Sequence, residues 1–249
     1  MAIEYNTLGT FEIIYNKPLP IKSSQVVLLL QAVLHNHVIS RSQLQEILFE
    51  DRDISNPTHH LHVVVSKARK LLADEGLPGA TIITRNGIFY WNDEIQVIED
   101  AREFEKAARE KRWEDACRIY KGTFLQNYQG KLWISNEARR YEEMFAFVMQ
   151  NIQAEPGHMI ELGTHAAKVQ PYWNHERLVV EALLKLGKKK EAERVIKETT
   201  KKYMDEMGIP FIYDTRIEDL EMIEINTYLR RNLKAREIVL DAIRRKIWE

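Results

Sequence analysis

Cysteine is almost missing from this chain of 249 residues, in which Cys117 stands alone. One thiol cannot form a disulfide within the chain, which excludes a disulfide-stapled scaffold and fits a reducing compartment. Long apolar runs are missing too, because the densest one, residues 26–30, is far shorter than the roughly 18 residues that cross a bilayer. Residues 1–5 have neither the basic nor the apolar region of a signal peptide. We therefore expect a cytoplasmic protein that does not contact membranes.

Motifs for catalysis are also lacking. The sequence contains no nucleophile motif, no glycine-rich phosphate loop and no pair of catalytic carboxylates, so we predict no enzyme activity and no cofactor. His59 and His62 would share one helical face, but metal sites usually add cysteine or carboxylate ligands, and none lies near them in sequence. We predict no metal site, and we expect Cys117, next to Ala116, to be a buried small residue.

Acidic residues are scarce in one window of an otherwise evenly charged chain. Residues 54–92 hold only Asp74 and Glu75, whereas the whole chain carries 36 basic and 37 acidic side chains and a net charge of −1. The window opens with a proline at a helix start, predicts a helix over 58–72 and closes with a hairpin signal over 81–92. A helix with a cationic end, followed by a hairpin with arginine at its tip, is the layout of a winged helix. Such a domain places those two parts on DNA.

Strand and helix signals divide the chain in two. Before residue 98 the apolar patterns predict strands at 3–5 and 11–15 and capped helices at 24–35 and 42–49. The helix at 58–72 and the hairpin follow them. From Glu99 onward the strand signals vanish and only helices are predicted, at 100–110, 113–121, 134–154, 158–169, 174–186, 189–206 and from 214 to near the end.

Two helical segments share one pattern. Residues 111–120 and 187–196 each have a turn, an acid, a small alanine and then an apolar position. Alanine is needed where two helices approach closely, so the pattern predicts a tetratricopeptide-like repeat array. The predicted fold class is therefore mixed, with an N-terminal winged helix-turn-helix (α+β) followed by an all-α tetratricopeptide-like helical-repeat domain.

The C-terminal segment has two rows of residues at seven-residue spacing, mostly apolar, as a coiled-coil seam requires. The rows are Met222, Leu229, Arg236 and Ile243, and Asn226, Leu233, Leu240 and Ile247. Such a helix can be a dimer seam, a cap on the repeat array or a linker to a further domain, and the pattern leaves these alternatives open.

Several stretches resemble one family of bacterial regulators. Residues 181–192 (EALLKLGKKKEA) are similar to its "ALxxLGrxxEA" turn, residues 203–209 (YMDEMGI) to its "LxEELGI" helix end and residues 214–216 (DTR) to its "ETR". Residues 112–125 are similar to its "WeeAlxlYrGpfL" segment, and residues 63–70 (VVVSKARK) to its "VhIsrLRrK" recognition helix. Together they resemble the SARP-type transcriptional activators, which join an OmpR/PhoB-type winged helix to a bacterial transcriptional activator domain.

This resemblance covers residue 2 to about 223 and implies three parts. These are the DNA-binding winged helix at 1–97, the tetratricopeptide-like activator domain at 98–224 and a C-terminal helix at 225–249. The sequence departs from the family at Val64, where a polar residue is usual, at Ala68, where leucine is usual, and at the Ile88-Phe89 pair of the hairpin.

Helical spacing divides the helix at 58–72 into two faces. Leu61, Val65, Ala68 and Leu72 recur at steps of four and three and form the predicted buried stripe. Periodicity alone fits a plain surface helix as well as a recognition helix, but the resemblance implies that the other face contacts DNA. It places His59, His60, Val63 and Lys67 at base edges, Ser66, Arg69 and Lys70 at phosphates, and Arg85 in the minor groove. The predicted DNA-binding residues are Thr58, His59, His60, Val63, Ser66, Lys67, Arg69, Lys70, Arg85 and Asn86.

The charge of the N-terminal part opposes strong DNA binding by a monomer. Residues 1–98 carry eight lysines and arginines against ten acids, a net charge of −2. We therefore expect a homodimer on double-stranded DNA, with the helical domain mediating self-association and contact with RNA polymerase. Four aromatic residues, Trp113, Trp133, Tyr172 and Trp173, could line a groove for a small-molecule effector, although such residues more often pack one helix against another. The alternative is a signalling adaptor with a degenerate winged helix, whose repeats bind a protein or a small messenger.

Overall fold

The structure is a computed structural model that describes residues 1–50, 54–128, 131–208 and 211. These residues are rich in helix and contain two small sheets, so the mixed class predicted from the sequence is confirmed at this level. The contacts divide the chain into two compact units, Met1–Met144 and Phe145–Glu249.

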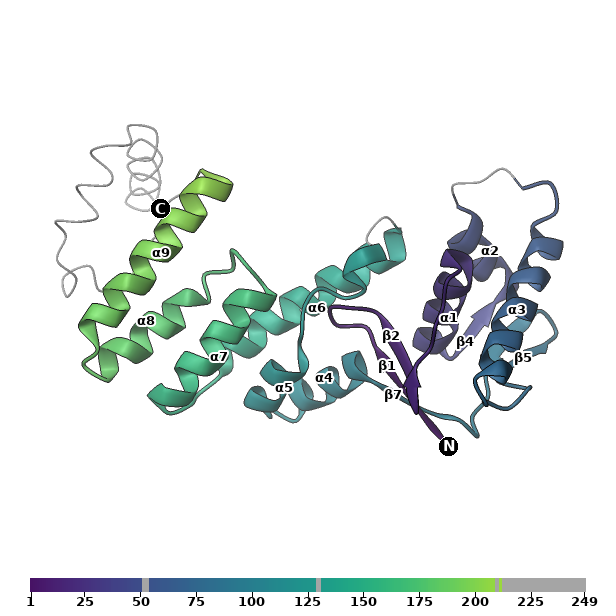
Figure 1. Ribbon diagram of the computed structural model, residues 1–249, viewed down its shortest axis with the longest axis horizontal. Coiled ribbons are helices and arrows are strands. Elements are labelled where there is room, and N and C mark those ends of the chain that lie inside the picture. Colours follow the sequence, from purple (N-terminus) through teal and green to yellow (C-terminus); the bar gives the residue numbers. More distant parts are fainter. Residues whose placement is uncertain (51–53, 129–130, 209–210, 212–249) are drawn as a thin grey trace. The chain divides into compact units, whose positions relative to one another are not determined.

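The first unit contains a four-stranded sheet in the order β3-β2-β1-β7 (Figure 1). Its strands are β1 Ala2–Asn6, β2 Glu12–Tyr15, β3 Lys17–Pro18 and β7 Gln96–Glu99. Strand β1 pairs antiparallel with β2 and parallel with β7, where Ile3 lies opposite Val97. Ile3 and Tyr5 alternate along β1 and are both buried. The parallel pair brings together two segments that are far apart in the sequence.

Along the chain, three helices and the strands of a three-stranded sheet come between β3 and β7. Their bounds are α1 Ser24–Asn36, β4 Val38–Ser40, α2 Arg41–Phe49, α3 Pro57–Asp74, β5 Ile82–Arg85 and β6 Ile88–Trp91. Each helix starts at a side chain that accepts a backbone N–H of its first turn, provided by Ser23, Ser40 and Asn56. This succession of helices and a hairpin is consistent with a winged helix-turn-helix.

The hairpin turns through two residues. Asn86 and Gly87 have φ angles of 50° and 75°, and Arg85 lies opposite Ile88 across the turn. Two left-handed residues in succession make a type I′ turn, which matches the twist of the flanking strands. The hairpin that the sequence predicts is confirmed.

The side of α3 that faces the core carries the residues that the sequence predicts to be buried. Leu61, Val65, Ala68 and Leu72 are buried, and Val64 joins them with only 4% of its surface exposed. All five belong to one cluster with the apolar side chains of α1 and α2. Val64 stands where the family resemblance has a polar residue, and its burial explains why an apolar side chain suits the position.

The remaining described residues are helical. The helices are α4 Asp100–Arg109, α5 Trp113–Ile119, a short 3-10 turn Gln126–Tyr128, α6 Leu132–Asn151, α7 Pro156–Val169, α8 Glu176–Lys185 and α9 Lys189–Met207. The six helices predicted between 100 and 206 are confirmed, and Ala116 and Ala192 are fully buried, as the shared pattern predicts. The helix predicted from 214, with its seven-residue spacing, lies outside the described residues.

Helices α7 and α8 approach closely at Gly163. A Cβ atom there would lie 2.9 Å from Cγ2 of Val179, so any side chain would force the helices apart. Helix α9 ends at Gly208, whose φ of 68° is left-handed. None of the helices within the described ranges is both long and apolar enough to cross a membrane.

The first unit also contains α4 and α5, and a half-buried carboxylate on α4 holds the segment that follows β1. Asp100 accepts hydrogen bonds from the backbone N–H groups of Thr7 and Leu8 at 2.8 and 3.0 Å and from the Thr7 hydroxyl at 2.8 Å. Burial raises the pKa of Asp100, while these hydrogen bonds oppose the rise. The domain boundary predicted between 97 and 98 lies inside this unit and stays a prediction.

Candidate nucleic-acid interface

Helix α3 presents an exposed face opposite its buried stripe. We call this the α3 face, and it consists of His59, His60, His62, Val63, Ser66, Lys67 and Lys70. Val63 is a large apolar residue with 38% of its surface exposed. An apolar side chain among hydrogen-bonding and cationic ones is a combination that can meet base edges, where a thymine methyl lies beside polar groups.

Three exposed cations lie on α3 and the hairpin, in a stretch that holds only two acids. Within the described part of the chain, Lys67, Lys70 and Arg85 have no ion-pair partner. In the helical region eight cations are paired with nearby acids, namely Arg102, Arg109, Arg112, Arg118, Arg139, Arg140, Arg177 and Lys188. Other exposed cations there, such as Lys189, Lys197 and Lys201 of α9, have no ion-pair partner among the described residues. Of the two acids between 54 and 92, Glu75 is itself paired, with Lys17 at 3.0 Å. The unpaired cations are therefore free to bind an anion such as phosphate.

Two of the predicted DNA-binding residues are engaged inside the protein. Thr58 is half-buried and accepts a hydrogen bond from Nε2 of Gln45 at 3.1 Å, which ties α3 to α2. Arg69 is also half-buried and donates from Nε to the Ile82 carbonyl and from Nη2 to the Thr84 hydroxyl, both at 2.8 Å. The other predicted residues, from His59 to Lys70 on α3 and Arg85 and Asn86 on the hairpin, are exposed.

The hairpin tip is flanked by an arginine that sequence reasoning missed. The backbone N–H of Arg41 donates to the Gly87 carbonyl at 2.8 Å, and its guanidinium lies 3.8 Å from where a Cβ of Gly87 would be. The pairing of β4 with β6 brings Arg41 there, since Ser40 lies opposite Ile88. A pairing between distant segments leaves no local signal, which is why the sequence did not single out Arg41.

The histidines and the cysteine of the predictions do not form a reactive centre. His59 and His60 lie with ring centroids 6.1 Å apart, and His60 also faces Phe49 at 6.4 Å. Among the described residues no group of three His, Cys, Asp or Glu could hold a metal ion. Cys117 is fully buried, as predicted, and burial raises the pKa of its thiol to about 12.

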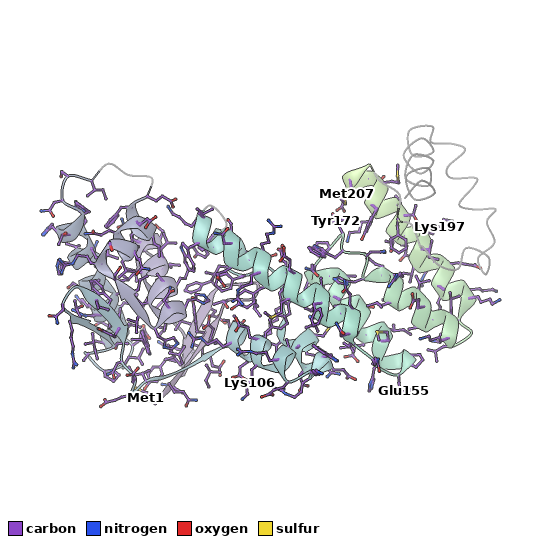
Figure 2. The ribbon with its side chains drawn as sticks, turned by 180° about the vertical axis from the view of Figure 1, so that it is seen from behind. Met1, Lys106, Glu155, Tyr172, Lys197 and Met207 are labelled. Carbon is purple, nitrogen blue, oxygen red and sulfur yellow. The ribbon has the colours of Figure 1, made fainter. Side chains whose placement is uncertain are left out.

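The four aromatic residues predicted for an effector groove fall in different units. Trp113 and Trp133 are half-buried in the first unit, where Trp133 lies against His35 and Phe124 at 6.0 and 6.3 Å. Tyr172, labelled in Figure 2, and Trp173 after it in sequence follow α7 in the second unit. Tyr172 packs on Tyr203 at 5.4 Å, while Trp173 is 45% exposed. The effector therefore stays a prediction.

Comparison with known proteins gives a likeness of fold alone. No protein-family model matches the chain, and no curated protein matches it. Among solved structures it is similar to Mycobacterium tuberculosis EmbR, in a structure of that protein in complex with a low-affinity phosphopeptide. The TM-score is 0.57 and the sequence identity 18%, over 84% of this chain. The match spans 62% of the length of EmbR.

Proposed function

We propose that this chain is a sequence-specific DNA-binding transcriptional regulator of SARP type. The observation that carries the proposal is the α3 face, where Lys67 and Lys70 lie exposed beside histidines and the exposed Val63, in the window of residues 54–92 with only two acids. Two further observations support it: the sequence motifs in the family's order, and the fold likeness to EmbR, which supports a SARP-like fold. No enzyme activity is part of the proposal.

In the proposed complex, α3 lies in the major groove and the hairpin in the minor groove. His59, His60, Val63 and Lys67 would read base edges, with Lys67 donating to guanine O6 and N7 and Val63 meeting a thymine methyl. Ser66 and Lys70 would contact phosphates, and Thr58 would lie close to the DNA backbone. Arg85 and Asn86 would enter the minor groove, where the potential is most negative.

The proposal is tested by replacing Lys67 with alanine. If Lys67 reads a base, the substitution weakens specific binding by roughly 1–3 kcal/mol and relaxes the preference at one base pair. Binding constants for the selected site and for random DNA, measured by fluorescence anisotropy, give the comparison. Lys197→Ala on α9 (Figure 2) is the matched control, because that lysine is also exposed but lies in the second unit. An equal loss on specific and random DNA would make Lys67 a phosphate contact instead.

Self-association completes the proposal, because the net charge of −2 over residues 1–98 predicts weak binding by a monomer. A dimer would place two winged helices on paired half-sites, and the helical domain would also contact RNA polymerase. We expect sedimentation to give a dimer for the full chain and a monomer for a chain that stops after Glu224. If both sediment as monomers at tens of micromolar, or both as the same dimer, the segment at 225–249 is not the dimer seam.

A further inference from the structure

Arg69 is the one arginine of α3, and it is held by the hairpin. Its guanidinium donates from Nε to the carbonyl of Ile82 and from Nη2 to the hydroxyl of Thr84, each at 2.8 Å. Ile82 and Thr84 are two residues apart in β5, so both acceptors lie along one stretch of the same strand. Figure 1 shows β5 beside α3, in agreement with these two bonds.

These hydrogen bonds occupy Nε and Nη2, the pair of donors that would otherwise bind a phosphate. Nε and Nη2 form one planar fork, and a fork is what allows arginine to bind an oxyanion with two parallel hydrogen bonds. With the fork on β5 and the side chain half-buried, Arg69 differs from Lys67 and Lys70, which are exposed on the same helix. Its surroundings therefore favour a role inside the protein over a contact with DNA.

The strand that Arg69 holds leads directly to the hairpin tip. Thr84 is followed by Arg85, the residue proposed for the minor groove, and then by the Asn86-Gly87 turn. The opposite edge of the hairpin is held by the backbone N–H of Arg41, which donates to the Gly87 carbonyl at 2.8 Å. The hairpin is thus attached to α3 on one edge and to α2 on the other.

We propose that Arg69 is a positioning residue that fixes the hairpin relative to α3, so that Arg85 is in place before DNA arrives. A contact whose partners are already ordered loses less conformational entropy on binding. The consequence for DNA affinity rests on the proposed function, whereas the attachment of the hairpin to α3 is a property of the free protein. Lysine cannot replace Arg69, because an ammonium group lacks the planar fork that reaches two acceptors.

A double-mutant cycle distinguishes positioning from direct contact. We expect Arg69→Ala and Arg85→Ala each to weaken DNA binding about tenfold, and the double variant to lose about tenfold as well, because Arg69 acts through Arg85. The same cycle between Arg69→Ala and Lys67→Ala should be multiplicative, since Lys67 does not depend on the hairpin. A roughly hundredfold loss in the Arg69–Arg85 double variant would overturn the proposal and make Arg69 an independent phosphate contact.

Thr84→Val tests the attachment without removing a cation. Valine keeps the branched shape of threonine but cannot accept the bond from Nη2 of Arg69. We expect a loss of DNA affinity of about threefold and faster hydrogen exchange of the hairpin amides in the free protein. Arg69→Lys should speed that exchange too, while Lys70→Ala, the neighbouring cation, should leave it unchanged.

The exchange measurement also separates this proposal from the proposed function. If the wild-type chain binds no DNA but Thr84→Val and Arg69→Lys speed exchange in the hairpin, the DNA-binding function fails and the attachment stands. If hairpin exchange is the same in all variants, Arg69 does not hold the hairpin, whatever the chain binds.

Discussion

Replacing Phe124 with alanine is expected to lower the free energy of unfolding of the first unit by about 3–5 kcal/mol. Phe124 is fully buried, with its ring stacked on Tyr141 at 5.3 Å and packed against His35 at 5.3 Å. His35 belongs to α1 and Tyr141 to α6, so the ring joins the N-terminal helices to the helical region within one unit. Alanine would leave a cavity and remove these aromatic contacts.

Guanidinium unfolding followed by hydrogen exchange of β1 and α4 peptides measures this loss. Leu132→Ala is the control, because this apolar side chain lies on α6 in the same unit and is 68% exposed, and a change of no more than about 1 kcal/mol is expected. If Phe124→Ala also changes stability by less than about 1 kcal/mol, the ring does not join the two regions.

Acid is expected to destabilise the second unit through His175. This side chain is buried between α7 and α8, with Nε2 2.7 Å from Oε1 of Gln170, and burial lowers its pKa to about 4. The unfolded chain takes up a proton near the ordinary histidine pKa of about 6.5, whereas the folded unit does so only near 4. The free energy of unfolding is therefore unaffected by the protonation of His175 above pH 6.5. It falls by roughly 3 kcal/mol as the pH drops from 6.5 to 4.

The prediction is checked by urea unfolding between pH 7 and pH 4.5, followed by hydrogen exchange of peptides from α7 and α8. His175→Gln keeps an amide that can hydrogen-bond Gln170 but cannot become charged, so we expect a smaller loss of stability in acid. His158→Gln, at an exposed histidine of α7, should follow the wild-type curve. Parallel curves for wild type and His175→Gln would show that protonation of His175 does not cause the acid loss.

Local sequence signals were sufficient for most helices and for the hairpin. Ser40 and Asn56 cap the helices that follow them, and Asn86-Gly87 turns the hairpin, because capping and φ > 0 depend on residues close together in the chain. The spacing of four and three residues, from which we predicted that Leu61 and Leu72 are buried, also follows from helix geometry alone.

Contacts between distant segments could not be predicted in this way. The parallel pairing of β1 with β7 and the position of Arg41 beside Gly87 depend on tertiary register, which no short pattern contains. The same reason applies to Arg69. The family resemblance implied a phosphate contact for Arg69, and only the packing of β5 against α3 shows what its guanidinium binds in the free protein.

Selection of genomic fragments on the purified chain shows whether the α3 face and the hairpin read a DNA sequence. The recovered site and a scrambled duplex are then titrated over a range of salt concentrations. We expect the chain to bind the site at least about 10³-fold more tightly than the scrambled duplex at the same salt, and both affinities to fall steeply as salt rises. Equal affinity for the two duplexes, or no fragment retained above an uncoated resin, would contradict it.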